Sequence, residues 1–379
     1  MRLRSKDPNY SGNFMSSKPH LLEQFLEVDV PVVVVGTYHT NDPPCVTQSL
    51  TRQFCRTLGD SPHNQRVTSR RLSSNVGRAF TQGRPPMPIF YADWAEVILP
   101  NGHRFPMDKY RATRELLQDD RSLTGMVEFI RSPLAFTEDI TRVHDEDYVS
   151  RDASELAGWA TGGTLAATYA VLQDPDISVA AQVAGGTHHA FAGHGEGFCV
   201  FNDIAVAIKS AISTLGEEAV CPVLVIDLDV HQGNGTAKIF EDDPRIVTFS
   251  MHGANNYPWK TRMKSTYDIE LDDKTDDARY NQVLAEWLPH LFEVHEPRLV
   301  FYQAGVDALH EDSFGRLGMT RDGLMRRNEM VYSECIKRQL PLVITMGGGY
   351  SRPMDASVAA HADVFRCAAI QYASNDAIE

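Results

Sequence analysis

Three side chains that could bind a metal ion follow one apolar run in the sequence. Asp227, Asp229 and His231 occupy alternate positions at the end of the run that begins at Val223. Successive side chains of an extended strand point to opposite faces, so residues at every second position share one face. A carboxylate that caps the following helix would explain one of these residues but not all three. The spacing therefore predicts a metal site at the end of a strand.

A further carboxylate, Asp307, follows the apolar run Leu299–Ala304. Together with Asp229 and His231 it would provide one nitrogen and two oxygen ligands. Such a set leaves a coordination position for water and a substrate carbonyl, as in catalytic rather than structural zinc sites. Its oxygen ligands would also accept Fe²⁺. These three residues are therefore candidate ligands of a catalytic metal.

Two neighbouring histidines, His188 and His189, follow a Gly-Gly pair, and Tyr350 follows three consecutive glycines. Imidazole titrates near neutral pH, so a pair of histidines at this site suits a general base and its electrostatic partner. Glycine lets the backbone approach a site closely, and a phenol can donate a hydrogen bond to a developing oxyanion. Taken alone, the glycine run would favour a packing role for Tyr350, whereas the other motifs favour a catalytic one.

The elements that must position these residues alternate between strands and helices. Short apolar runs predict buried strands at Ile89–Ala92, Val179–Ala184, Val223–Asp227, Ile246–Met251, Leu299–Ala304 and Leu342–Met346. Apolar residues near a period of 3.6 predict helices between them, such as Asp203–Leu215, Ala278–Phe292 and Asp322–Arg338. This alternation indicates a mostly parallel sheet covered on both faces, whose sites lie at the carboxyl ends of the strands. We therefore expect the motif residues to cluster there.

The composition is that of a globular protein with an acidic body. Of 379 residues, 42% are hydrophobic and 23% are charged, and the formal net charge is −14. No run of about 18 apolar residues occurs, which argues against a membrane span. The negative charge argues against direct binding of nucleic acid, which depends on Lys and Arg at the phosphates. It suits a basic partner, such as a Lys-rich protein tail.

The first 85 residues differ from the rest. They contain 11 Lys and Arg against 6 Asp and Glu, whereas the remainder contains 25 against 44. The stretch Ser61–Pro85 has five arginines and no acidic residue, as in organelle transit segments, although it begins far from Met1. We predict a basic extension at residues 1–85, either disordered or used for targeting, and a catalytic domain at residues 86–379.

From about residue 88 to residue 374, the sequence resembles the zinc-dependent histone deacetylases. The resemblance rests on GHRFPMDKY, VHDEDYV, GGTHHAFAGHGEGFCVFND, DLDVHQGNG, QAGVD and GGGY, in this order. The first and fourth of these motifs are most similar to class IV of the family and its bacterial relatives. The resemblance implies the arginase–deacetylase fold, a three-layer α/β/α domain with a mostly parallel sheet of about eight strands.

The resemblance also implies a role for each motif residue. The implied zinc ligands are Asp229, His231 and Asp307. His189 would be the general base that activates water and later protonates the leaving amine. His188, with Asp227 as its carboxylate partner, would stabilise the oxyanion. Tyr350 would polarise the scissile carbonyl from the side opposite the zinc.

A substrate tunnel and structural potassium are implied in the same way. Gly197 and Phe198 would line the acyl-lysine tunnel, with Trp259 near its opposite wall. The first potassium site would use Asp227, Asp229, Ser250 and the carbonyls of His231 and Met251. A second would use carbonyls near Phe240, Asp243 and Ile246.

One position differs between classes of the family. Asn234 stands where class I members have an aspartate that pairs with the base histidine. A neutral amide stabilises an imidazolium less than a carboxylate does, so we expect His189 to be less basic than its class I counterpart. Class IV members share this asparagine, which we interpret as a mark of subtype.

The predicted function is hydrolysis of the amide bond of acyl-lysine in histone tails or other proteins. Small acylated amines such as acetylpolyamines, and long-chain fatty-acyl lysine, are alternative substrates. An arginase-like ureohydrolase shares the expected fold, but it needs bridging carboxylates, and Leu309 removes an Asp-x-Asp pair after Asp307. A non-catalytic binding module would lack a ligand, the base or the tyrosine, and all are present. By family analogy we expect the nucleus and cytoplasm, or a mitochondrion or plastid if the basic leader is a transit segment.

Overall fold

The computed structural model describes residues 85–94, 99, 103–151 and 155–375 of the chain. The predicted extension therefore lies outside the described residues, apart from Pro85. One eight-stranded sheet runs in the order β2-β1-β3-β8-β7-β4-β5-β6, and every neighbouring pair is parallel. Its strands are β1 (Met87–Tyr91), β2 (Val127–Arg131), β3 (Val179–Gln182), β4 (Val223–Asp227), β5 (Ile246–Gly253), β6 (Tyr267–Leu271), β7 (Leu299–Gln303) and β8 (Leu342–Thr345).

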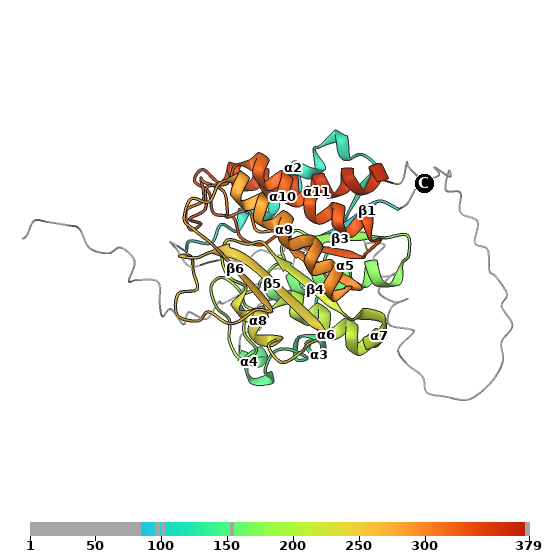
Figure 1. The fold of residues 1–379 in the computed structure, drawn as a ribbon. Helices are drawn as coiled ribbons and strands as arrows, with labels where there is room; N and C mark the ends of the chain where they lie inside the picture. The colour runs from blue at the N-terminus through green and yellow to red at the C-terminus, as the bar shows by residue number, and fades with distance from the viewer. Residues whose placement is uncertain (1–84, 95–98, 100–102, 152–154, 376–379) are drawn as a thin grey trace, which may run out of the picture. The chain divides into compact units, whose positions relative to one another are not determined.

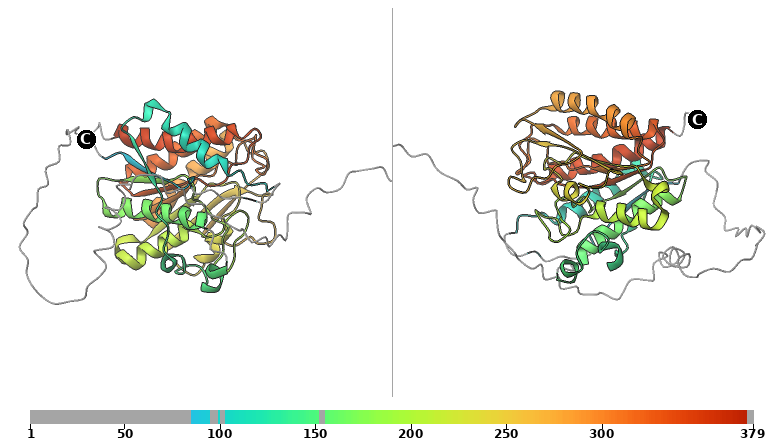
Figure 2. Two further views of the ribbon diagram at one scale, coloured as in Figure 1. Left: turned by 180° about the vertical axis from the view of Figure 1, so that it is seen from behind. Right: turned by 60° about the horizontal axis from the view of Figure 1, so that its bottom comes forward.

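Helices cover both faces of this sheet (Figures 1 and 2). The longer ones are α2 (Asp108–Gln118), α5 (Glu155–Gln173), α6 (Asp203–Leu215), α9 (Asp277–His295), α10 (Arg321–Lys337) and α11 (Asp355–Asn375). Shorter ones are η1 (Arg121–Leu123), α3 (Thr137–Ile140), α4 (Glu146–Arg151), α7 (Glu217–Val220) and α8 (Asn234–Ile239). Helices α2, α9, α10 and α11 pack together on one face, and α5 packs with α6 on the other. The predicted three-layer fold with a parallel sheet is confirmed.

The side chains of the central strands explain this layering. Along β4, Leu224 and Ile226 belong to one hydrophobic core, whereas Val223 and Val225 belong to another. Successive side chains of a strand point to opposite faces, so each face of the sheet has its own core. A strand buried on both faces reads as a continuous apolar run, which is the pattern that the sequence shows.

Two strands were not predicted from the sequence, because they lie at the edges of the sheet and lack an apolar run. The sequence VEFIR forms β2 and YDIEL forms β6, and most side chains in both are partly or fully exposed. An edge strand with a half-open face tolerates charged residues, so it shows no apolar run. The six interior strands are all among those predicted.

The four motif-bearing strands, β3, β8, β7 and β4, are consecutive neighbours in the sheet. Their carboxyl ends therefore lie side by side, and the segments that follow them meet above the middle of the sheet.

None of the described helices is long and apolar enough to cross a membrane.

Candidate metal centre and active site

Asp229, His231 and Asp307 meet at the carboxyl ends of β4 and β7. Nδ1 of His231 lies 3.0 Å from Oδ1 of Asp229 and 3.0 Å from Oδ2 of Asp307. One potential ligand atom from each residue lies within 4.8 Å of the others, and all three side chains are buried. The alternation of Asp229 and His231 after β4 thus places both on one side, next to the carboxylate that follows β7.

Backbone amides hold the two carboxylates in place. Asp229 accepts hydrogen bonds from the Gly348 amide at 2.7 Å and from the His231 amide at 3.0 Å. Asp307 accepts one from the Val230 amide at 2.9 Å. Because these donors belong to the segments after β4 and β8, the strand ends and the carboxylates position one another.

The residues present fit a divalent metal ion. Two buried carboxylates and one imidazole form the mixed oxygen and nitrogen set that zinc accepts. Burial and the neighbouring Asp229 carboxylate raise the pKa of Asp307 to about 7, so a cation here would relieve the cost of two close negative charges. The site also needs glycine, since a Cβ at Gly348 or Gly305 would collide with a carboxylate oxygen of the set.

His188 pairs with a carboxylate beside the metal centre. Its Nδ1 lies 2.7 Å from Oδ2 of Asp227, and its Nε2 lies 3.8 Å from Oδ1 of Asp229. Burial lowers the pKa of His188, but the two carboxylates outweigh burial and raise it to about 9. Gly233 leaves room for this pair, because a Cβ there would collide with Asp227.

His189 contacts an amide instead of a carboxylate. Its Nδ1 lies 2.7 Å from Oδ1 of Asn234, at the start of α8. Burial and the neighbouring His188 and His231 hold the pKa of His189 well below its usual value, and the contact with Asn234 opposes them. The structure thus brings Asn234 to the histidine with which the sequence analysis paired it.

Tyr350 lies beside the metal centre, next to a buried lysine. Burial and the carboxylates of Asp229 and Asp307 raise the pKa of Tyr350 well above its usual value, so its phenol keeps the proton that it could donate. Nζ of Lys109 lies 4.7 Å from the centroid of the Tyr350 ring and donates to the Gly347 carbonyl at 3.2 Å. Burial lowers the pKa of Lys109 to about 8. Sequence reasoning did not assign a role to this lysine.

Aromatic rings gather around Phe198, which the resemblance placed on the acyl-lysine tunnel. Its ring centroid lies 5.6 Å from that of Tyr350 and 5.2 Å from that of Phe105, and the side chain is 38% exposed. Gly197 precedes it with φ +61°, and a Cβ there would lie 2.9 Å from Cδ2 of His189. Only glycine allows this left-handed backbone to pass so close to the histidine.

The other aromatic neighbour of the histidines is Tyr257. Its ring centroid lies 4.9 Å from that of His189 and 6.2 Å from that of His231. Trp259, which the resemblance placed near this wall, is 52% exposed and contacts the ring of Tyr257 at 5.6 Å. Tyr257 therefore contacts both Trp259 and the histidines. Both residues belong to the irregular segment between β5 and β6, where spacing in the sequence does not determine direction.

The residues of the first predicted potassium site lie on two neighbouring strands or directly after one of them. Asp227 of β4 and Ser250 of β5 are paired in the sheet register, and the Ser250 hydroxyl lies 2.9 Å from Nδ1 of His252. Both potassium sites stay predictions.

Comparison with known proteins identifies the family of this chain. A model of the histone deacetylase domain matches residues 149–365. The chain belongs to the histone deacetylase family. This stretch includes every predicted catalytic and ligand residue, whereas Lys109 and Phe105 lie before it.

Relatives of this histone deacetylase family member occur in bacteria, plants and animals. An uncharacterised protein of Picosynechococcus sp. is 37% identical over 301 residues, which cover 74% of this chain and 97% of that protein. Histone deacetylase 2 of Arabidopsis thaliana is 35% identical over 175 residues, 46% of this chain and 44% of the plant protein. Human histone deacetylase 1 is 26% identical over 314 residues, 72% of this chain and 63% of the human protein. The chain thus spans less than two thirds of the length of these two deacetylases. Its histone deacetylase domain makes it a hydrolase of the deacetylase type.

Proposed function

We propose that this chain is a zinc-dependent deacylase that hydrolyses the amide bond of acylated lysine in histone tails or other proteins. The observation that carries the proposal is the meeting of a buried Asp-His-Asp set with two histidines and a tyrosine. Zinc held by Asp229, His231 and Asp307 would supply a Lewis acid that polarises the carbonyl and lowers the pKa of water. Fe²⁺ is the alternative metal.

His189 moves the protons in the proposed reaction. An imidazole that donates from Nδ1 to the Asn234 oxygen leaves Nε2 as a free acceptor. Because the pKa of His189 is held low, this nitrogen is unprotonated at neutral pH and takes a proton from the attacking water. The imidazolium then protonates the lysine nitrogen as the carbon–nitrogen bond breaks. The products are the free amine and a carboxylate.

His188 and Tyr350 stabilise charge in this reaction. The raised pKa of His188 keeps its imidazole cationic, so it attracts the negative charge that develops on the carbonyl oxygen. Tyr350 keeps its proton and donates it in a hydrogen bond to the same oxygen. Asp227 keeps His188 oriented.

The walls of the site and the family support this substrate class. Phe198 next to Tyr350, and Tyr257 next to His189, provide aromatic surfaces that suit the methylene chain of an acyl-lysine. The negative net charge of −14 suits a lysine-rich tail. Asn234 favours a class IV subtype, for which acetyl and long fatty-acyl groups are both candidates. We keep the nucleus and cytoplasm as the proposed location.

The test is hydrolysis of matched acetyl-lysine and myristoyl-lysine peptides by the zinc-loaded protein, with His189→Ala as the comparison. We expect turnover of at least one peptide and a loss of about 10²-fold or more in the variant, since general acid–base catalysis contributes that much. The preferred peptide identifies the acyl chain. If a folded, zinc-containing protein cleaves neither peptide, protein lysine is not its substrate, and acetylpolyamines become the next class to assay.

A further inference from the structure

Glu196 accepts hydrogen bonds from three side chains with a single oxygen. The donors to its Oε1 are Nδ2 of Asn234 at 2.8 Å, the Tyr257 hydroxyl at 2.6 Å and the Thr261 hydroxyl at 2.6 Å. Glu196 lies in the segment between β3 and α6, and only 14% of its side chain is exposed. Three donors from two other segments of the chain thus converge on one shielded carboxylate.

Asn234 links this carboxylate to His189. Its Nδ2 donates to Glu196 and, at 3.0 Å, to the Thr261 carbonyl, whereas its Oδ1 faces Nδ1 of His189. The two ends of an amide differ in that one donates and the other accepts. With two acceptors on the nitrogen side, the oxygen must face the imidazole. Nδ1 of His189 must then carry the proton, and Nε2 is left free for catalysis.

The Glu196 carboxylate also strengthens the hydrogen bond between Nδ1 of His189 and Oδ1 of Asn234. Hydrogen bonds in a chain polarise one another, so an anion at the amide nitrogen makes the amide oxygen a stronger acceptor. Bonds to a carboxylate are shorter and stronger than bonds between neutral groups. Through Asn234, the charge of Glu196 acts on His189, although none of the described hydrogen bonds or ion pairs joins the two side chains directly.

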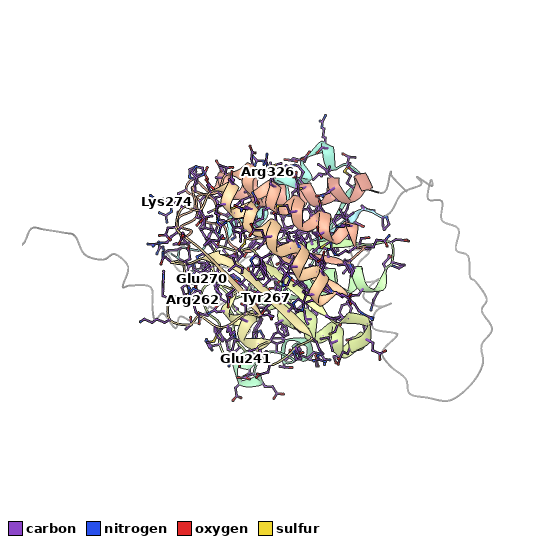
Figure 3. The ribbon with its side chains drawn as sticks, viewed as in Figure 1. Glu241, Arg262, Tyr267, Glu270, Lys274 and Arg326 are labelled. Carbon is purple, nitrogen blue, oxygen red and sulfur yellow. The ribbon has the colours of Figure 1, made fainter. Side chains whose placement is uncertain are left out.

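The same oxygen holds the aromatic wall at the histidine. The Tyr257 ring lies nearly perpendicular to the His189 ring, at 86°, while its hydroxyl donates to Glu196. Arg262 holds this loop independently. It donates to the carbonyls of Ala254 at 2.6 Å and Pro258 at 3.0 Å, and it pairs with Glu270 of β6, which lies beside it in Figure 3. A change at Glu196 should therefore leave the path of the loop intact.

We propose that Glu196 is a positioning residue of the deacylase site, which orients the Asn234 amide and thereby selects the tautomer of His189. The proposal rests on the proposed function in taking His189 as the base. In this arrangement the Glu196 carboxylate acts on His189 through the Asn234 amide, whereas in class I members a carboxylate contacts the histidine directly. It also joins three segments around one oxygen: the one before α6, the start of α8 and the loop before β6.

The first test uses Glu196→Gln and Glu196→Ala in the full, zinc-loaded chain. Loss of a partner that orients a metal ligand typically costs about 10- to 100-fold in activity, and we take the same range for a partner that orients the base. We expect Glu196→Ala to lose this much in kcat, with a smaller change in KM. Glu196→Gln keeps the shape and an acceptor oxygen but removes the charge, so its loss should be intermediate. Equal kcat in Glu196→Ala and the parent protein would overturn the proposal.

A second substitution tests the direction of the effect. In the parent protein Asn234→Asp sets two carboxylates against each other, so we expect a lower kcat. In the double variant with Glu196→Ala, the carboxylate that replaces the Asn234 amide can accept a hydrogen bond from Nδ1 of His189 directly. No glutamate then stands beside it to oppose its charge. The double variant should therefore be more active than either single variant. A merely structural role of Glu196 predicts the opposite, a double variant no better than Glu196→Ala.

The tautomer can be observed without any substrate. Imidazole ¹⁵N spectra of zinc-loaded protein, with His189 assigned from a His189→Gln sample, should show a proton on Nδ1 in the parent and a tautomer mixture in Glu196→Ala. If the parent hydrolyses no acyl-lysine yet shows this change, the positioning role stands and the proposed function fails. An unchanged His189 signal in Glu196→Ala would overturn the positioning role, whatever the activity.

Glu270→Gln is the matched control. This glutamate also holds the loop before β6, through Arg262, but it is 54% exposed and none of its described contacts reaches Asn234 or His189. We expect near-parent kcat and an unchanged His189 spectrum. If Glu270→Gln lowers kcat as much as Glu196→Gln, loosening of the loop explains both effects and the proposal is overturned.

Discussion

At the scale of single residues, Tyr350 is the clearest separable part of the mechanism. Its pKa is raised well above the usual value by burial and by Asp229 and Asp307, so it acts as a donor at neutral pH. Tyr350→Phe removes this donor and keeps the ring. Loss of one oxyanion donor typically costs about 10²- to 10³-fold in kcat, and we expect that range on the preferred acyl-lysine peptide.

The same variant should leave the metal unaffected. Tyr350 is not one of the three candidate ligands, so the zinc content measured by mass spectrometry should equal that of the parent protein. Asp307→Ala, which removes a ligand, is the contrasting variant and should lose both zinc and turnover. Parent-like kcat in Tyr350→Phe would remove the phenol from the mechanism.

The residues that sequence reasoning missed share one physical cause. Tyr257, Glu196 and Lys109 act through contacts between segments that are far apart in the chain, such as the 238 positions that separate Lys109 from the Gly347 carbonyl. A motif shows which residue types follow a strand, but not which way a loop turns. For Glu196 the only signal was a charged residue beside a conformationally demanding glycine, Gly197. That signal alone does not predict three donors.

At the scale of elements, the apolar runs predicted the interior of the sheet and the place of the site. Strands β3, β8, β7 and β4 are buried on both faces, which leaves a continuous apolar pattern, and the residues after them meet. The edges β2 and β6 lack that pattern because one side of each is open. Residue type and spacing indicated the metal ligands and a histidine base, whereas the separate roles of His188 and His189 came from the family resemblance.

The glycines after these strands make an element-scale prediction. A Cβ at Gly348 would collide with Asp307 and contact Asp229, so Gly348→Ala should displace the carboxylates while leaving the sheet intact. We expect Gly348→Ala to weaken the affinity for zinc at least tenfold, because changes to groups that position metal ligands have effects of this size. Its circular dichroism spectrum should match that of the parent protein.

Gly158→Ala is the control for this prediction. It lies in α5, where an added Cβ meets only the flexible end of the Leu134 side chain, and alanine favours a helix. This variant should bind zinc as tightly as the parent. Equal zinc affinity in Gly348→Ala and Gly158→Ala would show that the close approach of the glycine does not matter for the metal.

At the scale of the whole molecule, the charge asymmetry separates the described body from the first 85 residues. The predicted boundary at residue 85 and the role of the basic leader stay predictions, because residues 1–84 lie outside the described ranges. The described body carries the fold and the site together, and its two cores lie on opposite faces of one sheet. The metal centre joins the ends of β4, β7 and β8, so we expect a change at this centre to alter the stability of the whole domain.

Metal removal tests this coupling. Without a cation, the buried carboxylates of Asp229 and Asp307 face each other with only His231 between them, and the raised pKa of Asp307 reflects that cost. A ligand at about 100 times its Kd stabilises the native state by about 2.7 kcal/mol, which corresponds to a Tm change of roughly 5 °C in a domain of this size. We therefore expect a chelator to lower the Tm of the parent protein by several degrees and zinc to restore it. Asp307→Ala should melt at the same temperature with and without chelator. If chelation leaves the Tm of the parent unchanged while turnover stops, the metal contributes to chemistry but not to the stability of the strand ends.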